Sequence, residues 1–135
     1  MMNMGRSIEI LNPYEWLPGH GENSVEVRTE RGGPIVTVGY DGDADARERE
    51  LRFTSVCSFY SQVFPGPSML GIEKRAAALL LRGVLVEYPD SKAARAWVRH
   101  FQNSRRVRHY EILFLAENLQ LVVFAAGVSL SEAAT

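Results

Sequence analysis

Cysteine is nearly absent from this sequence: Cys57 is the only one among 135 residues. No disulfide can form within the chain, which excludes a small secreted scaffold held together by disulfides. One cysteine and three widely spaced histidines also fail to provide four closely spaced ligands for a structural zinc ion. We therefore expect no metal and no cofactor. Because Cys57 keeps the alternation of Phe53 and Phe59, we expect a buried, unreactive thiol.

Long hydrophobic runs are missing as well. The longest uninterrupted apolar stretches are residues 76–81 and 121–127, both far below the roughly 20 residues that cross a bilayer as a helix. The first eleven residues lack the apolar segment of a secretory signal. We therefore expect a cytoplasmic protein that has no membrane partner.

Neither sign of charge is in large excess. Fifteen basic and sixteen acidic residues give a net charge of −1. This balance excludes a globally basic nucleic-acid coat, and no zinc-finger or RNP motif accompanies it, so nucleic acid is disfavoured as a partner. The apolar share of 46% and the charged share of 23% are those of an ordinary globular protein. We predict a single domain over residues 1–135.

Three segments in the first half of the chain alternate between apolar and polar residues, which is typical of half-buried strands. The first two, Ser24–Glu30 and residues 34–40, flank a glycine turn at residues 31–33 and therefore predict a hairpin. The third covers residues 51–60. Together they predict an antiparallel meander with one face in water.

One amphipathic helix is predicted over residues 91–103. Ser91 is a suitable N-cap. The apolar residues recur at helical spacing and form one stripe that faces the sheet, which comprises Ala94, Trp97, Val98 and Phe101.

Residues 107–116 and 119–128 predict a C-terminal hairpin with its turn at Asn118. Both faces of these strands are apolar, so one helix cannot cover them, and we expect a homodimer. Residues 73–82 fit either a helix or part of a long strand. The predicted fold class is therefore α+β, with a single antiparallel sheet of six or seven strands packed by one main helix at about 91–103.

The clearest charge asymmetry lies in residues 91–110, which carry six basic residues and no acidic one. One interpretation is a binding site for an anionic ligand or an acidic protein surface. The alternative is structural, because cations near a helix C-terminus stabilise its dipole and charged stripes usually face water. The candidate ligand-binding residues in this segment are Arg95, Arg99, His100, Arg105, Arg106 and His109.

Two loops are also candidates. In residues 12–21, two prolines and two glycines exclude long regular structure; the aromatic residues Tyr14 and Trp16 either plug the end of the sheet or line a pocket with His20. Residues 41–45 place three aspartates at alternate positions, but the glycine and glutamate of an EF-hand are missing. We predict an acidic strand connection there, which could meet the basic helix.

No catalytic motif is recognisable, so the sequence favours a non-catalytic binding or interaction module. The alternative is a small enzyme with its site between the aromatic loop and the helix. In that enzyme Arg95 or Arg99 would bind a substrate anion. A histidine would move the proton, the candidates being His20, His100 and His109.

Overall fold

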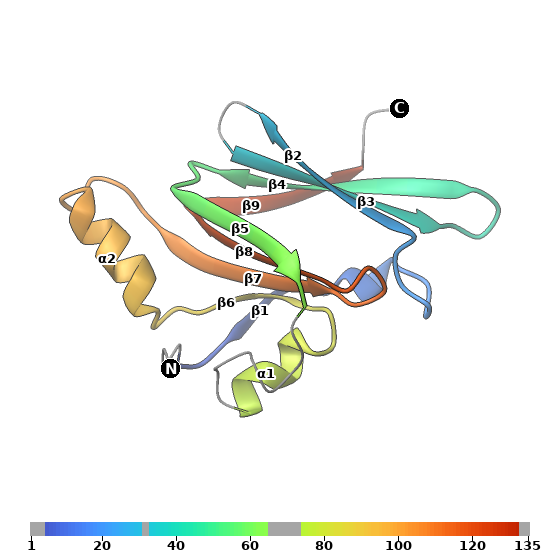
Figure 1. The fold of residues 1–135 in the computed structure, drawn as a ribbon, viewed down its shortest axis with the longest axis horizontal. Coiled ribbons are helices and arrows are strands. Elements are labelled where there is room, and N and C mark those ends of the chain that lie inside the picture. The colour runs from blue at the N-terminus through green and yellow to red at the C-terminus, as the bar shows by residue number, and fades with distance from the viewer. Residues whose placement is uncertain (1–4, 31–32, 65–73, 133–135) are drawn as a thin grey trace.

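The computed structural model describes residues 5–30, 33–64 and 74–132, and within these residues two antiparallel sheets pack face to face (Figure 1). The five-stranded sheet has the order β1-β6-β7-β8-β5 and the four-stranded sheet the order β2-β3-β4-β9. The prediction of one sheet with six or seven strands is therefore wrong. The strands are β1 (Ile8–Leu11), β2 (Ser24–Glu30), β3 (Gly33–Asp41), β4 (Ala46–Thr54), β5 (Ser58–Val63), β6 (Leu85–Glu87), β7 (Arg108–Phe114), β8 (Leu119–Ala125) and β9 (Gly127–Glu132), and the helices are η1 (Pro13–Glu15), α1 (Lys74–Leu80) and α2 (Lys92–His100).

Two bends produce the second sheet. β4 continues into β5 and β8 continues into β9, so one long antiparallel ribbon passes from one sheet to the other. Ser55 takes a positive φ of 51° at the bend. The prediction of a single strand over residues 51–60 is wrong for this reason. The bend also separates Cys57 from Phe53: Cys57 is half-buried among residues that pack under α2, whereas Phe53 lies in the main core.

The main core lies between the two sheets. Val36, Val38 and Leu51 of the four-stranded sheet pack with Ile112 and Leu121 of the other sheet. The four-stranded sheet thus covers the face of the C-terminal hairpin that the helix alone could not cover. The two apolar faces of this hairpin are therefore no longer evidence for a homodimer. The outer face of the four-stranded sheet is mainly polar, as the alternation predicts, although Ile35 is buried there between Arg28 and Arg52.

Both helices cover the outer face of the five-stranded sheet (Figure 1). The ambiguous segment 73–82 contains a helix, α1, followed by Gly83 at a φ of +79°. The Ser91 N-cap is confirmed, since its Oγ accepts the Ala94 N–H at 3.1 Å. α2 ends at His100 rather than at residue 103, because Gln102 and Asn103 both have positive φ.

Most of the remaining predictions are confirmed, and one strand was not predicted. The hairpins β2–β3 and β7–β8 are confirmed, and Asn118 has the expected positive φ of 53°. As predicted, Trp97 and Phe101 pack towards β8, next to Val122 and Phe124. Strand β1 was missed because its four residues show no clear alternation. None of the helices within the described residues is long and apolar enough to cross a membrane.

Candidate functional site

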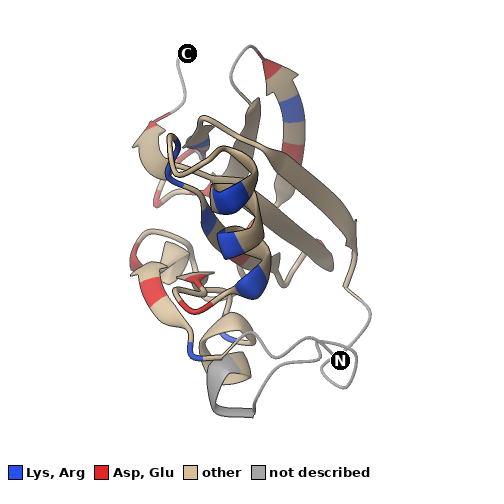
Figure 2. Ribbon diagram, turned by 90° about the vertical axis from the view of Figure 1, so that its left-hand side faces the viewer, with Lys and Arg blue, Asp and Glu red and all other residues tan. Residues whose placement is uncertain are grey.

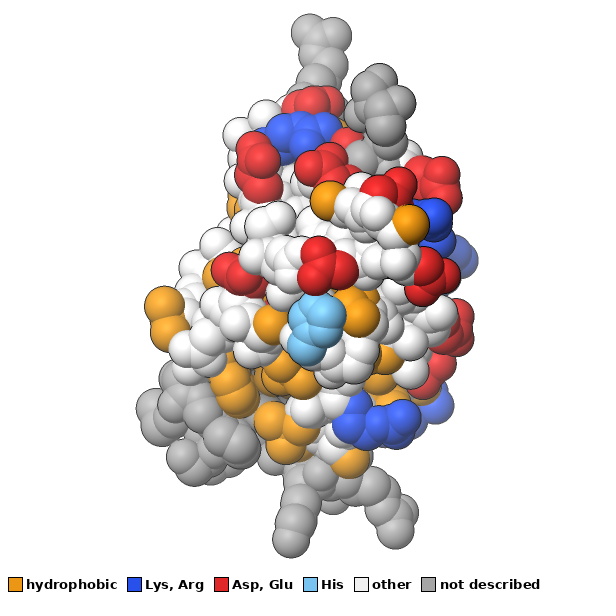
Figure 3. Space-filling view, turned by 90° about the vertical axis from the view of Figure 1, so that its right-hand side faces the viewer, with side chains coloured by type: hydrophobic (Ala, Val, Ile, Leu, Met, Phe, Trp, Pro, Cys, Tyr) orange, Lys and Arg blue, Asp and Glu red, His pale blue; other side chains and the backbone are white. Residues whose placement is uncertain are grey.

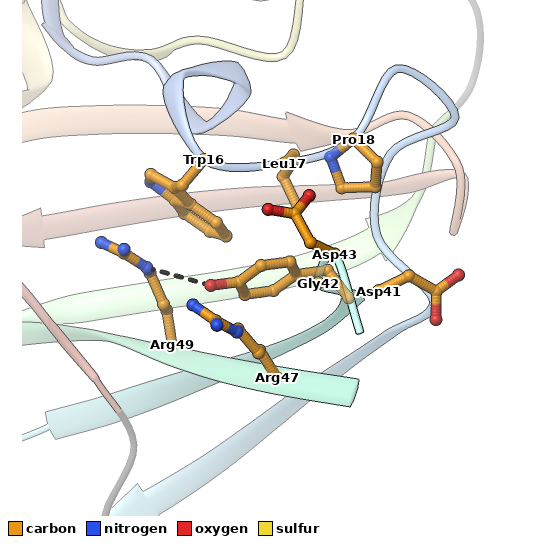
Figure 4. Close-up of a pocket in the computed structure, with 9 residues that line it drawn as sticks. Trp16, Leu17, Pro18, Asp41, Gly42, Asp43, Arg47 and Arg49 are labelled. Atoms are coloured by element: carbon orange, nitrogen blue, oxygen red, sulfur yellow. Dashed lines mark hydrogen bonds between the residues drawn. The ribbon is translucent and has the colours of Figure 1, made fainter. Parts of the chain in front are cut away.

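A pocket of about 330 Å³ lies at one end of the molecule, between the loop after η1 and the β3–β4 hairpin (Figure 4). This volume lies at the lower end of the range of small-molecule sites. The lining residues come from three segments and are Trp16, Leu17, Pro18, Tyr40, Asp41, Gly42, Asp43, Arg47 and Arg49.

Local sequence explains how the aromatic wall forms. The Asn12 side chain caps η1 by accepting the Tyr14 N–H at 3.0 Å, and Pro13 begins the turn. The short helix ends at Trp16, whose ring lies 5.0 Å from that of Tyr40 at an angle of 54°. Leu17 then enters the main core and fixes the loop against the sandwich.

Arg49 is the most distinctive residue of the pocket. Its Cζ lies 5.1 Å from the centroid of the Trp16 ring, and its Nε donates to the Tyr40 hydroxyl at 3.2 Å. The side chain is half-buried. No carboxylate from the part of the chain that the structure describes lies within ion-pair distance of it. The pocket therefore holds a positive charge that is fixed in place and has no described carboxylate at ion-pair distance, although Glu132 lies opposite Arg49 in the β4–β9 ladder.

The neighbouring charges are better compensated. Arg47 Nε binds Asp45 Oδ1 at 3.2 Å. Asp41 accepts from Asn23 Nδ2 at 2.8 Å and lies 3.2 Å from His20 Nε2. Figure 4 shows Arg49 approaching the pocket from β4, whereas Asp43 comes from the turn after β3.

The aromatic loop divides between the two predicted alternatives, and His20 takes part in neither. Trp16 lines the pocket, but Tyr14 packs against the main core, where burial and the nearby Glu22 raise its pKa. His20 is exposed beside Asp41 and does not line the pocket. Sequence reasoning missed Arg49, which the period of β4 places on the face directed towards the other sheet, because β4 was predicted to begin only at residue 51.

The basic helix lies far from this pocket. α2 and the β3–β4 turn occupy opposite ends of the longest axis (Figure 1), so the predicted catalytic site between the aromatic loop and the helix does not form. Figure 3 shows the end opposite α2, where acidic side chains are spread over the surface. The acidic connection therefore does not meet the basic helix of its own molecule. No group of three or more metal-ligating side chains occurs among the described residues.

The basic residues of α2 form an exposed stripe (Figure 2). Arg95 donates to the backbone oxygen of Asp90 at 2.9 Å, and Arg105 lies 4.3 Å from the Phe101 ring centroid. His100 is exposed. Within the described residues, no carboxylate pairs with four exposed cations of this surface, which are Lys92, Arg95, Arg99 and Arg106.

A buried polar network lies on the outer face of the five-stranded sheet. Glu111 accepts hydrogen bonds from the Tyr88 hydroxyl at 2.8 Å and from the Gln120 amide, which in turn accepts from Gln62 at 2.7 Å. Burial raises the pKa of Glu111, and the two hydrogen bonds to its carboxylate oppose that rise. No sequence pattern indicates this network, because its members come from four strands or strand ends.

His109 belongs to the same face but has a structural role. Its Nδ1 lies 2.8 Å from Ser91 Oγ, so its partner is the residue that caps α2. Its Nε2 is buried and has no hydrogen-bond partner among the described residues. Burial lowers the pKa of His109 to about 4. The ring is therefore neutral at physiological pH, and because it is buried against Tyr88 and Phe124 an external substrate does not reach it.

No family model, no curated protein and no solved structure matches this chain.

Proposed function

We propose that the protein is a non-catalytic binding module whose pocket binds a small molecule through an anionic head group. The observation that carries this proposal is the half-buried guanidinium of Arg49, which Trp16 and Tyr40 hold in place and which no described carboxylate contacts at ion-pair distance. A carboxylate or phosphate on the ligand supplies the missing negative charge.

The chemistry of the guanidinium supports this assignment. Stacking on Trp16 and the Nε bond to Tyr40 fix the plane of the group, while its two terminal nitrogens have no partner among the described residues. A planar fork of this kind matches a carboxylate or a phosphate through two parallel hydrogen bonds. Because the group is already ordered, binding costs little side-chain entropy. The Trp16 and Tyr40 rings offer apolar surface to the rest of the ligand.

The pocket composition favours binding over catalysis. The nine lining residues include no serine, cysteine, histidine or lysine, so the pocket contains no nucleophile with an adjacent histidine base. Of its two carboxylates, Asp41 is already engaged by Asn23 and His20. A ligand that binds here therefore meets groups that hold and orient it.

Calorimetric titration with four probes that share one ring tests the proposal. We expect benzoate and phenyl phosphate to bind at one site per chain, whereas benzyl alcohol and benzylamine do not, because only the first two carry negative charge. Arg49→Gln should abolish binding of both anions, and the matched variant Arg95→Gln should leave it unchanged. Equal binding of all four probes, or anion binding that survives Arg49→Gln, would contradict the proposal.

A second candidate function is docking of an acidic protein surface on α2. It is favoured by the four exposed cations of this surface, none of which is paired with a described carboxylate. The Trp97 and Phe101 rings stack on each other and Arg105 covers Phe101, so they are poor platforms for nucleic-acid bases. We expect a polyglutamate peptide to bind in a manner that Arg95→Glu with Arg99→Glu removes. Preferential binding of a polyuridine RNA would overturn this candidate.

A further inference from the structure

We infer that the edge of β5, which no described strand covers, pairs antiparallel with β5 of a second copy of this chain, so that two five-stranded sheets join across a two-fold axis. This interface is separate from the pocket, which lies on other strands. Figure 1 shows β5 in green, with β8 as its neighbour in the sheet.

The four edge strands of the two sheets differ in how they are protected against pairing. β1 has an irregular register between Glu9 and Leu11, β2 carries three charged residues, and β9 ends in Glu132. Bulges and charges on edge strands prevent association with other strands. β5 has neither, since its sequence is Ser-Phe-Tyr-Ser-Gln-Val and its register with β8 is regular.

β5 also carries the two most exposed large hydrophobic side chains of the described residues. Val63 is 71% exposed and Tyr60 is 48% exposed. Exposed apolar groups on a strand with an open edge indicate an interaction surface. An isolated molecule leaves this surface in water, whereas strand pairing buries part of it.

The backbone of β5 has groups available for pairing. Phe64 N–H donates to the Asn118 oxygen of the neighbouring turn at 2.9 Å. Because an antiparallel ladder alternates its hydrogen-bonding direction from residue to residue, the N–H and C=O groups of Phe59, Ser61 and Val63 point away from β8. These are the groups that an added antiparallel strand binds.

A second copy fits this edge because the strand is complementary to itself. A two-fold axis at Ser61 places Ser61 opposite its own equivalent and Phe59 opposite Val63 of the second copy, so that apolar side chains meet on one face. On the other face Tyr60 meets Gln62 of the second copy. Each outward residue then exchanges backbone hydrogen bonds with its counterpart.

Charge at the two ends of β5 supports the antiparallel direction. Arg105 Nη2 donates to the Ser55 oxygen at 3.2 Å, so basic residues 105–106 lie near the start of the strand. Exposed Glu117 lies in the turn beside its end, next to Asn118. Antiparallel pairing brings the basic end of one copy towards the acidic end of the other, which favours association at low ionic strength.

Light scattering coupled to size exclusion tests the inference with charge variants of Ser61. The wild-type chain should have twice the mass of the 15.1 kDa monomer. Ser61→Lys and Ser61→Glu should each be monomeric, because each places like charges opposite one another. An equimolar mixture of the two should recover the dimer. The matched control Ser131→Lys, an exposed serine on the edge strand β9, should remain dimeric.

Hydrogen exchange provides a second readout that does not depend on a variant. The amides of Phe59, Ser61 and Val63 should exchange slowly in the dimer and become faster on dilution. A wild-type monomer across micromolar concentrations, a dimeric Ser61→Lys variant, or a mixture of the two Ser61 variants that stays monomeric would overturn the inference. Arg49→Gln leaves β5 intact, so this variant should still form the dimer even though it loses anion binding. Its oligomeric mass therefore tests this inference independently of the pocket proposal.

Discussion

The guanidinium carbon of Arg49 lies 5.1 Å from the centroid of the Trp16 ring, although more than thirty residues separate the two in the sequence. Trp16 follows a capped 3-10 turn, and Arg49 projects from β4 towards the interior of the sandwich. Their stacking holds a positive charge at the wall of a pocket that also contains the Tyr40 ring. Stacked cations of this type contribute about 0.5–1 kcal/mol where they are partly exposed.

Tyr40→Phe should weaken anion binding without removing it. The substitution keeps the ring that faces Trp16 and removes the hydroxyl that orients Arg49 Nε. We expect benzoate affinity, measured by calorimetry, to fall by about 1 kcal/mol, roughly fivefold. The control Tyr60→Phe, which removes the hydroxyl of a half-exposed tyrosine on β5, should leave benzoate affinity unchanged. A loss of affinity in Tyr60→Phe that equals the loss in Tyr40→Phe would contradict a positioning role for the Tyr40 hydroxyl.

The sequence predicted local elements well and long-range arrangement poorly. The Ser91 cap and the Asn118 turn depend on neighbouring residues, and both are found where expected. The division into two sheets depends on a bend at Ser55, whose alternating neighbours look the same whether the strand is straight or bent. Period alone does not reveal which sheet a strand joins.

The candidate site could be predicted only in part for the same reason. Trp16 was identified because large aromatic residues in a loop rich in proline and glycine are conspicuous. Arg49 was not, because its importance arises from a loop more than thirty residues earlier that packs over it. The arginines of α2 were conspicuous by their number, yet the structure brings none of them to the pocket.

Ser91→Ala should destabilise the protein more than an ordinary surface substitution. Ser91 Oγ accepts the Ala94 N–H and also binds His109 Nδ1, so its loss leaves two groups without a partner. We expect the free energy of unfolding in urea to fall by about 1–2 kcal/mol. The matched variant Ser129→Ala, at an exposed position of β9, should change it by less than about 0.5 kcal/mol. Equal effects of the two variants would contradict the double role of Ser91.

The contribution of His109 to stability should decrease as pH falls from 6.5 to 4. The pKa of His109 is about 4 in the folded protein, against 6.5 for an unperturbed histidine, so the unfolded chain binds more protons in this range. The stabilisation is therefore complete above pH 6.5 and is lost as pH approaches 4, amounting to about 3 kcal/mol. Chemical denaturation across this range measures it.

Two histidine variants identify the source of that pH dependence. His109→Phe should reduce the loss of stability between pH 6.5 and pH 4, here called the acid limb. Phenylalanine does not titrate, and it fits beside Tyr88 and Phe124. His100→Gln, at an exposed position, should retain the limb. An acid limb that persists in His109→Phe would show that another group produces it.

Glu111 should contribute a pH dependence opposite to that of His109, and Glu111→Gln should remove it. Because burial raises the pKa of Glu111, the folded state binds more protons than the unfolded chain just above pH 4.5, and stability is lost as pH rises through the folded pKa. The neutral amide of Glu111→Gln avoids that loss. The side-chain amides of Gln120 and Gln62 can rotate by 180° so that their hydrogen bonds match the new amide. The stability of Glu111→Gln relative to wild type should therefore increase from pH 4 to pH 8. A difference that does not vary with pH would contradict a buried carboxylate that titrates.

The most direct test of the pocket uses the two tryptophans of the chain as reporters. Trp16 lies in the pocket and Trp97 on α2, so their indole N–H signals in a proton–nitrogen correlation spectrum distinguish the two candidate sites. During titration with benzoate we predict that the Trp16 signal shifts to saturation while the Trp97 signal stays in place, and that Arg49→Gln removes the shift. A shift of Trp97 alone, or no shift of Trp16 at millimolar benzoate, would contradict the account.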